Sequence, residues 1–148
     1  MYKRQVERLG SLNLWQLAIK PGKPFAYGSI HSEGEPCHFM GLPGNPVSSF
    51  ITFLLLVRPF LLALQGARLT DIQRSTRIAH FGWSRADKRR EFLRVKHNAQ
   101  GGLDLFANQS SGVLTSAVWG DGVVDNPAGQ VIKQGDTVQF ISFAEWMA

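Results

Sequence analysis

The sequence predicts an α/β unit in residues 1–71, followed by a small all-β barrel domain in residues 72–148. In the first part, strand-like runs lead through a tight Gly/Pro loop into a long apolar helix, which is typical of α/β proteins. In the second part, short strand-like runs are separated by glycine-containing turns, which is typical of small barrels and sandwiches. A single cysteine among 148 residues excludes a disulfide-bonded scaffold and favours a reducing compartment.

The first predicted element is a short amphipathic helix at the start of the sequence. Val6 and Leu9 lie one helical turn apart, and Gly10 follows them as a helix stop. Strand-like runs follow at residues 12–18, 25–30 and 37–42. The third run leads directly into the Gly/Pro loop that precedes the apolar helix.

The most apolar segment, residues 46–64, predicts a buried helix that ends near residue 65. Asn45 suits the N-cap position and Gly66 suits the C-terminal stop. Pro59 predicts a kink or a local break, because proline lacks the N–H that a helix interior requires. Arg58 argues against a membrane span, which requires about 20 predominantly apolar residues. We therefore expect no membrane partner.

The second part contains five further strand-like runs. They lie at residues 77–80, 90–97, 103–108, 122–125 and 137–143. Turns that contain glycine separate most of these runs. We place the domain boundary near Asp71, where the pattern changes.

The net charge of +5 is distributed unevenly along the chain. Residues 1–70 contain seven basic and three acidic residues, whereas residues 71–148 contain nine basic and eight acidic residues. We therefore expect the first part to meet an anion. Charge alone leaves nucleic acid, an anionic metabolite and an acidic protein as alternatives.

The first chemical motif is Lys20-Pro21-Gly22-Lys23-Pro24. Its two prolines stiffen the loop, so the two lysines start partly pre-organised, and its glycine lets the backbone approach a ligand closely. Two ammonium groups aimed together favour an oxyanion or phosphate between them. The alternative is a solvated turn with surface lysines.

The second motif is Gly41-Leu42-Pro43-Gly44-Asn45-Pro46-Val47-Ser48, at the junction of a strand and a helix. Free N–H groups and the positive end of the helix dipole favour an anion at such a junction, and the Ser48 hydroxyl could reach it. The spacing matches neither of the common glycine-rich phosphate motifs. The alternative is a tight turn with an Asn cap.

Two further segments are weaker signals by themselves. Residues 85–94 are rich in arginine and lysine, but Asp87 and Glu91 among them weaken a nucleic-acid interpretation. Residues 108–112 form a polar loop that contains Ser111. The His, Cys and Glu residues of 31–38 lack the spacing of a zinc site.

Together these motifs resemble one family. IKPGKPFAYG at 19–28 and GLPGNPVS at 41–48 are similar to the molybdopterin molybdenumtransferase family, which includes MoeA-type bacterial enzymes and the C-terminal region of gephyrin. RREFLR at 89–94, QSSGVLTS at 109–116, GDG at 120–122 and GDTV at 135–138 resemble the family's C-terminal β-domain in the same order. The resemblance covers the C-terminal part of the family only.

The resemblance implies a role in molybdenum cofactor biosynthesis. Family members are cytoplasmic, homodimeric transferases that insert molybdate into adenylylated molybdopterin with the help of Mg²⁺. We expect no nucleic-acid partner, because acidic residues lie within the basic segment at 85–94. It implies that residues 1–71 are half of a molybdopterin-binding α/β domain. By position it assigns molybdate to Lys20, Lys23, Pro24, Ser48, Arg89 and Ser111. It assigns molybdopterin to Lys20, Pro21, Gly22, Lys23, Pro24, Gly41, Pro43, Gly44, Asn45 and Ser48.

Two departures from the family pattern bear on activity. The family's upstream half, with the acidic residues expected to hold Mg²⁺, is absent from this sequence, so no metal ligand and no catalytic residue is assigned. Gln16 occupies a position that is lysine in many relatives. We therefore expect an isolated chain that is inactive and that self-associates. The alternative function is a non-catalytic fragment that binds pterin or an anion, or that acts as a scaffold.

Overall fold

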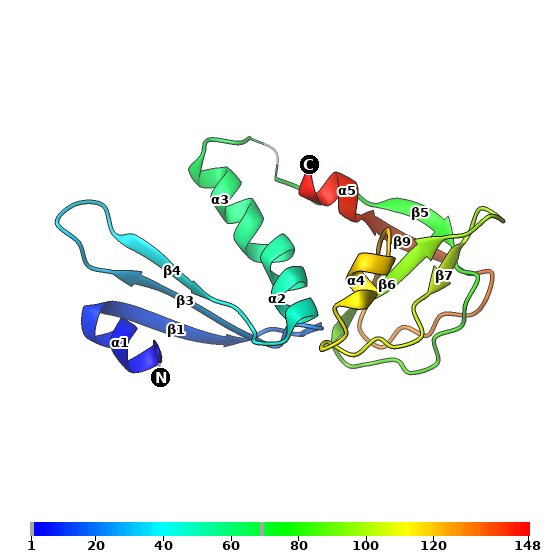
Figure 1. Ribbon diagram of the computed structural model, residues 1–148, viewed down its shortest axis with the longest axis horizontal. Coiled ribbons are helices and arrows are strands. Elements are labelled where there is room, and N and C mark those ends of the chain that lie inside the picture. Colours follow the sequence, from blue (N-terminus) through cyan, green and yellow to red (C-terminus); the bar gives the residue numbers. More distant parts are fainter. Residues whose placement is uncertain (1, 69) are drawn as a thin grey trace.

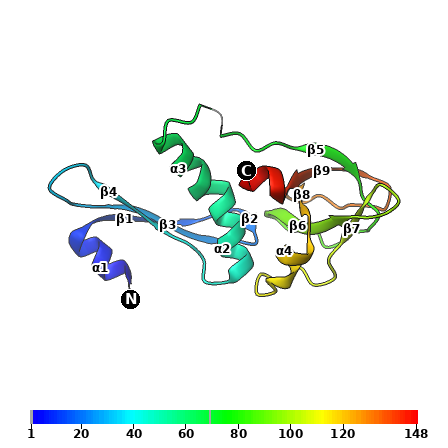
Figure 2. The same cartoon turned by 45° about the horizontal axis from the view of Figure 1, so that its top comes forward.

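The computed structural model describes residues 2–68 and 70–148, and it combines helices with two β-sheets. A three-stranded sheet lies at one end of the molecule and a larger sheet at the other, with a long helix between them (Figure 1; Figure 2). The smaller sheet has the order β1 (Gly10–Gln16), β3 (Pro24–Ile30), β4 (Cys37–Gly41). The larger sheet contains β2 (Ile19–Lys20), β5 (Ser75–Ile78), β6 (Arg90–His97), β7 (Leu103–Leu105), β8 (Gly122–Asn126) and β9 (Thr137–Ser142).

The first helix, α1 (Tyr2–Leu9), ends where Gly10 begins β1, as predicted, and buries Val6. The α/β prediction for residues 1–71 is correct in that helix and sheet are mixed, but it is wrong in the pairing. Strand β3 pairs antiparallel with both β1 and β4, whereas an α/β unit has parallel strands. The reason is the short connections, because a parallel pair requires a crossover of a dozen or more residues.

The long helix runs continuously over Pro46–Leu64. It consists of α2 (Pro46–Thr52), a π-helical turn η1 (Phe53–Val57) and α3 (Arg58–Leu64). The π-helical turn ends two residues before Pro59, so the irregularity predicted near this proline is a local widening of a continuous helix and not an interruption of it. A wider turn accommodates the missing N–H and the bulk of the ring.

The prediction of a buried helix is correct only for its first half. Val47, Ile51 and Leu54 are at most 2% exposed, because α2 and the start of η1 pack against the larger sheet. In residues 58–64, all of which the structure describes, no side chain is buried. This end of the helix extends past the sheet (Figure 1). By length and composition alone the helix could also cross a membrane.

The larger sheet has an apolar core on each face, because side chains alternate along its strands. Leu93 and Val95 of β6 contribute to one core, and Phe92 contributes to the other. The second core is covered by α2 and by α5 (Phe143–Met147). The sequence did not predict α5 or α4 (Thr115–Trp119), because each spans only about one helical turn.

The strand pairing of the larger sheet closes on itself. The order is β2-β6-β8-β9-β5, β7 pairs with β6, and a bridge joins Ala79, directly after β5, to Leu103 of β7. This closed path agrees with a small barrel. Ile19 of β2 pairs in parallel with Arg90 of β6, so residues 1–71 contribute a strand to this sheet. The domain boundary near Asp71 stays a prediction.

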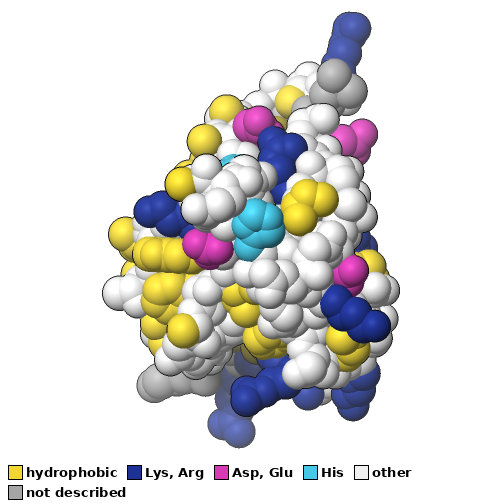
Figure 3. Space-filling model, turned by 90° about the vertical axis from the view of Figure 1, so that its right-hand side faces the viewer, with side chains coloured by type: hydrophobic (Ala, Val, Ile, Leu, Met, Phe, Trp, Pro, Cys, Tyr) yellow, Lys and Arg dark blue, Asp and Glu magenta, His cyan; other side chains and the backbone are white. Residues whose placement is uncertain are grey.

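Basic side chains are spread out on the face formed by the larger sheet. There, Lys and Arg lie at several separate places between acidic and uncharged side chains (Figure 3). Within the described residues, this face therefore shows no single continuous basic surface of the kind that tracks a nucleic-acid backbone. The expectation of no nucleic-acid partner stays a prediction.

Candidate functional site

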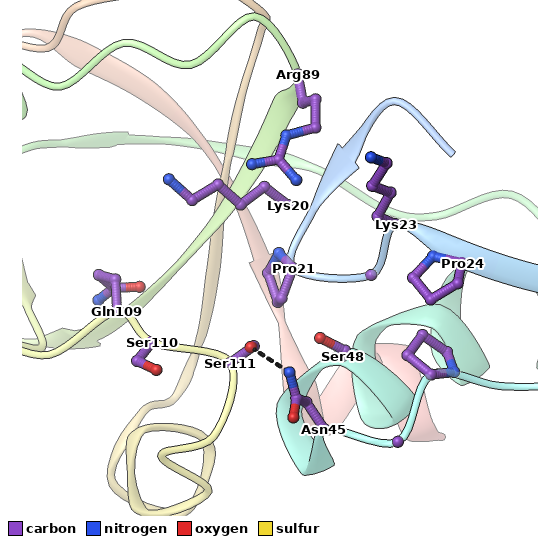
Figure 4. Close-up of a pocket in the computed structure, with 13 residues that line it drawn as sticks. Lys20, Pro21, Lys23, Pro24, Asn45, Ser48, Arg89, Gln109, Ser110 and Ser111 are labelled. Carbon is purple, nitrogen blue, oxygen red and sulfur yellow. Dashed lines mark hydrogen bonds between the residues drawn. The ribbon is translucent and has the colours of Figure 1, made fainter. Parts of the chain in front are cut away.

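A pocket of about 500 Å³ lies where four segments that are distant in sequence meet (Figure 4). The segments are the loop after β2, the loop before α2, the residue before β6 and a loop at 109–111. We call it the Lys20 pocket; it is lined by Lys20, Pro21, Gly22, Lys23, Pro24, Pro43, Gly44, Asn45, Ser48, Arg89, Gln109, Ser110 and Ser111. Its volume lies within the range of about 300–1,000 Å³ that is typical of small-molecule sites.

The structure brings together almost every residue that the sequence assigned to the site. Gly41 is the exception, because it ends β4 opposite Ala26 and does not line the pocket. Gln16 ends β1 and lines a second hollow, which shares Lys23 and Arg89 with the Lys20 pocket. Sequence analysis did not assign Gln109 and Ser110 to the site, although both belong to the polar loop that contains Ser111.

The Lys-Pro loop is held in place by its direct packing on the long helix. Gly22 has a φ of 118°, a conformation that favours glycine. A Cβ atom at this position would lie 2.5 Å from the Oγ1 atom of Thr52, which is fully buried in α2. The glycine therefore sets the close approach that positions Lys20 and Lys23 at the pocket.

The loop that contains Ser111 forms hydrogen bonds with the start of the long helix. Asn45 occupies the N-cap position, but its side chain makes no capping hydrogen bond. Instead its Nδ2 atom donates to Ser111 Oγ at 2.9 Å (Figure 4), and the Val47 N–H donates to the Ser111 carbonyl oxygen at 3.1 Å. The N-cap position predicted for Asn45 is therefore confirmed, but the Ser111 carbonyl and not the Asn45 side chain supplies the acceptor. Ser48 lies in the first turn and is 4% exposed.

Two of the three cations in the Lys20 pocket are paired with carboxylates. Arg89 donates from Nε and Nη2 to the two oxygens of Asp87, each at 3.0 Å. Lys20 Nζ lies 3.3 Å from Asp87 Oδ2 and 3.5 Å from Glu91 Oε1. Lys23 is exposed and forms no ion pair with the residues that the structure describes. The pocket therefore carries less net positive charge than its three cations indicate.

These contacts fix the protonation state of the ion pair. Side-chain and backbone hydrogen bonds from Arg89, with a smaller contribution from Lys20, hold the pKa of Asp87 well below its usual range. The hydrogen bonds to Asp87 raise the pKa of Arg89 above its already high value. Both groups are therefore charged at neutral pH.

The described residues do not fit a Mg²⁺ site. Mg²⁺ prefers carboxylate and water oxygens in octahedral geometry. None of the described residues that line the Lys20 pocket is acidic, and the nearby Asp87 and Glu91 already contact cations. Within residues 2–68 and 70–148, no group of three or more His, Cys, Asp or Glu side chains is placed to hold a metal ion.

Comparison with protein families and relatives agrees with this architecture. Residues 76–143 match the MoeA C-terminal region (domain IV). Molybdopterin molybdenumtransferase of Haemophilus influenzae is 50% identical over 66 residues, which cover 45% of this chain and 15% of that protein. The molybdenum cofactor synthesis protein cinnamon of Drosophila melanogaster is 35% identical over 115 residues, which cover 74% of this chain and 18% of that protein. The chain thus spans less than a fifth of either relative.

Solved structures show the same fold. The molybdopterin biosynthesis MoeA protein from Pyrococcus horikoshii OT3 matches 90% of this chain and 33% of its own, with a TM-score of 0.69 and 25% identity. A molybdenum cofactor biosynthesis protein from Pyrococcus furiosus matches 89% of this chain and 46% of its own, with a TM-score of 0.70 and 23% identity. The resemblance that the sequence motifs predicted is confirmed.

Proposed function

We propose that this chain, a MoeA-type C-terminal region, acts in molybdenum cofactor biosynthesis as part of a molybdopterin molybdenumtransferase. The proposed reaction inserts molybdate into adenylylated molybdopterin. One observation carries the proposal: Lys23, Arg89 and Ser111 come from three distant segments and line one pocket. A pocket of cations and hydroxyls suits an oxyanion substrate.

The donor set of the Lys20 pocket suits a tetrahedral dianion such as molybdate. Arg89 binds Asp87 through Nε and Nη2, which leaves Nη1 outside these hydrogen bonds and available to an anion. Lys23 adds an exposed ammonium group, and the hydroxyls of Ser48 and Ser111 add neutral donors. In this proposal Lys20 acts mainly as a bridge, because it contacts both Asp87 and Glu91.

The same geometry favours a second candidate, binding without turnover by the isolated chain. The lining that is described offers no carboxylate, so we propose that the ligands for Mg²⁺ come from elsewhere in the assembled enzyme. We also propose a homodimer in the cytoplasm, as the family resemblance implies. The exposed apolar residues of α3, Leu61 and Leu64, support self-association.

Calorimetric titration with tungstate, a molybdate analogue, tests the anion site. Lys23→Ala should weaken binding by about 5- to 150-fold, which corresponds to the 1–3 kcal/mol of a hydrogen bond to a charged group. Lys133→Ala removes an exposed lysine outside the pocket and should leave the affinity unchanged. Equal affinities of the wild type and Lys23→Ala would contradict the proposed site.

Nucleotide release separates the two candidate functions. The assay supplies adenylylated molybdopterin, molybdate and Mg²⁺ to the isolated chain. Tungstate binding without nucleotide release supports the binding function of this chain alone. Full turnover by the isolated chain would contradict the proposal that the Mg²⁺ ligands lie elsewhere.

A further inference from the structure

A second pocket lies beside the segment that leads into β2, and its lining residues differ from those of the Lys20 pocket. It has a volume of about 260 Å³, and we call it the Phe92 pocket. Apolar side chains from the segment before β2, from η1 and from β6 form most of its lining, together with two arginines. The lining residues are Leu17, Ala18, Ile19, Leu55, Leu56, Arg74, Arg90 and Phe92.

The two arginines of this pocket share one buried carboxylate. Asp125 of β8 has a side chain that is 1% exposed, and its Oδ2 atom accepts from Arg74 Nε at 2.8 Å and from Arg90 Nη2 at 2.8 Å. The hydrogen bonds from Arg90 to Asp125 also raise the pKa of that arginine. Both guanidinium groups are therefore held in place by contacts that do not depend on a ligand.

One carboxylate balances only one of these two positive charges. Asp125 is the sole acidic partner of Arg74 and Arg90 among the residues that the structure describes. The arginine side chains stay 36% and 47% exposed, whereas Asp125 is inaccessible. The Phe92 pocket therefore combines an apolar interior with a fixed, uncompensated positive charge at its edge.

We propose that the Phe92 pocket docks a linear segment of a partner protein that carries a large apolar side chain beside an acidic residue. The apolar side chain enters the pocket, and the carboxylate binds Arg74 and Arg90. The volume supports a single side chain, because small-molecule sites are larger, about 300–1,000 Å³. The positive charge of Arg74 and Arg90 favours an acidic residue beside the apolar residue of the peptide and disfavours a basic residue there. Pre-organised arginines keep the cost of binding low.

A displayed peptide library tests this proposal. Eight-residue peptides carry Leu, Ile or Phe at one central position, flanked by Asp or Glu; a matched library carries Lys at the flanking positions. We expect enrichment of the acidic library only. No enrichment, or equal enrichment of the basic library, would overturn the proposal.

Variants then locate the binding of the enriched peptides. Arg74→Gln leaves Arg90 to pair with Asp125 and should weaken peptide binding at least about tenfold. Leu56→Gln places a polar side chain in the apolar lining and should weaken peptide binding by a similar factor. Arg77→Gln changes an arginine outside the pocket and should have no effect. Unchanged binding by Arg74→Gln, with the fold verified by circular dichroism, would overturn the assignment. Loss of binding in Lys23→Ala would place the peptide in the Lys20 pocket and would also overturn it.

Discussion

Replacement of Asp87 by asparagine should tighten anion binding in the Lys20 pocket. The Asp87 carboxylate accepts two hydrogen bonds from the Arg89 side chain and lies 3.3 Å from Lys20 Nζ, so it offsets the positive charge that an anion would meet. Asparagine keeps the size of the side chain and one acceptor oxygen. It removes the negative charge that repels a dianion.

The magnitude follows from the geometry of Arg89. A dianion bound at Nη1, on the other edge of the guanidinium from Asp87, would lie on the order of 7 Å from the carboxylate, and at the dielectric constant of water their repulsion is about 1.2 kcal/mol. That energy corresponds to about an eightfold change in Kd. Some of the gain is lost because Arg89 is held less firmly, so we expect binding that is about three- to eightfold tighter.

Calorimetric titration with tungstate at low and high salt measures this effect. Asp71→Asn removes an equal charge at an exposed position outside the pocket and should leave the Kd unchanged. The gain in Asp87→Asn should shrink as salt is added, because screening weakens the repulsion. Weaker binding by Asp87→Asn would refute this reasoning and would show that Asp87 acts mainly by positioning Arg89.

Three further results are expected. In urea denaturation, Gly22→Ala should lower the free energy of unfolding by about 1–3 kcal/mol, because the φ of Gly22 and the nearness of Thr52 Oγ1 both oppose a side chain. The control Gly44→Ala should leave the free energy of unfolding nearly unchanged, because a Cβ atom there meets nothing within 4 Å. The lowered pKa of Asp87 means that its pairing stabilises the fold above the ordinary aspartate pKa of about 3.9, and that this contribution is lost as the pH falls further. The difference in unfolding free energy between the wild type and Asp87→Asn should therefore be constant from about pH 7 to pH 5 and shrink below about pH 5. A difference that grows in acid would contradict the pairing. Leu61→Glu should reduce self-association in light scattering, because Leu61 is an exposed apolar residue of α3.

Local patterns in the sequence were sufficient to predict most of the strands. Residues 90–97 are predicted and observed as a strand, because turns bound a short run that contains the apolar residues Phe92, Leu93 and Val95. The predicted run at 103–108 was too long and ends at Leu105, and the run at 12–18 ends at Gln16. Strand ends depend on which partner strand is available, and a single sequence does not contain that information.

Contacts between distant residues explain what the sequence did not predict in the site. The Lys-Pro loop and the helix start were both recognised, because proline, glycine and lysine at short spacing have direct backbone consequences. The hydrogen bond from Asn45 to Ser111 joins residues 66 positions apart, and the Ser111 carbonyl takes the place of the Asn45 side chain as the capping acceptor. In the same way Asp87 and Glu91 were noted only as acidic residues in a basic segment, whereas the fold places both beside Lys20.

The location of bound tungstate is the most direct test of the central claim, that four segments form one oxyanion site. Crystals soaked in tungstate locate the metal by its anomalous scattering. We predict a peak in the Lys20 pocket within hydrogen-bonding distance of Arg89 and Lys23, and its loss in Lys23→Ala crystals. An empty Lys20 pocket at a tungstate concentration that saturates the protein in calorimetry would contradict the account.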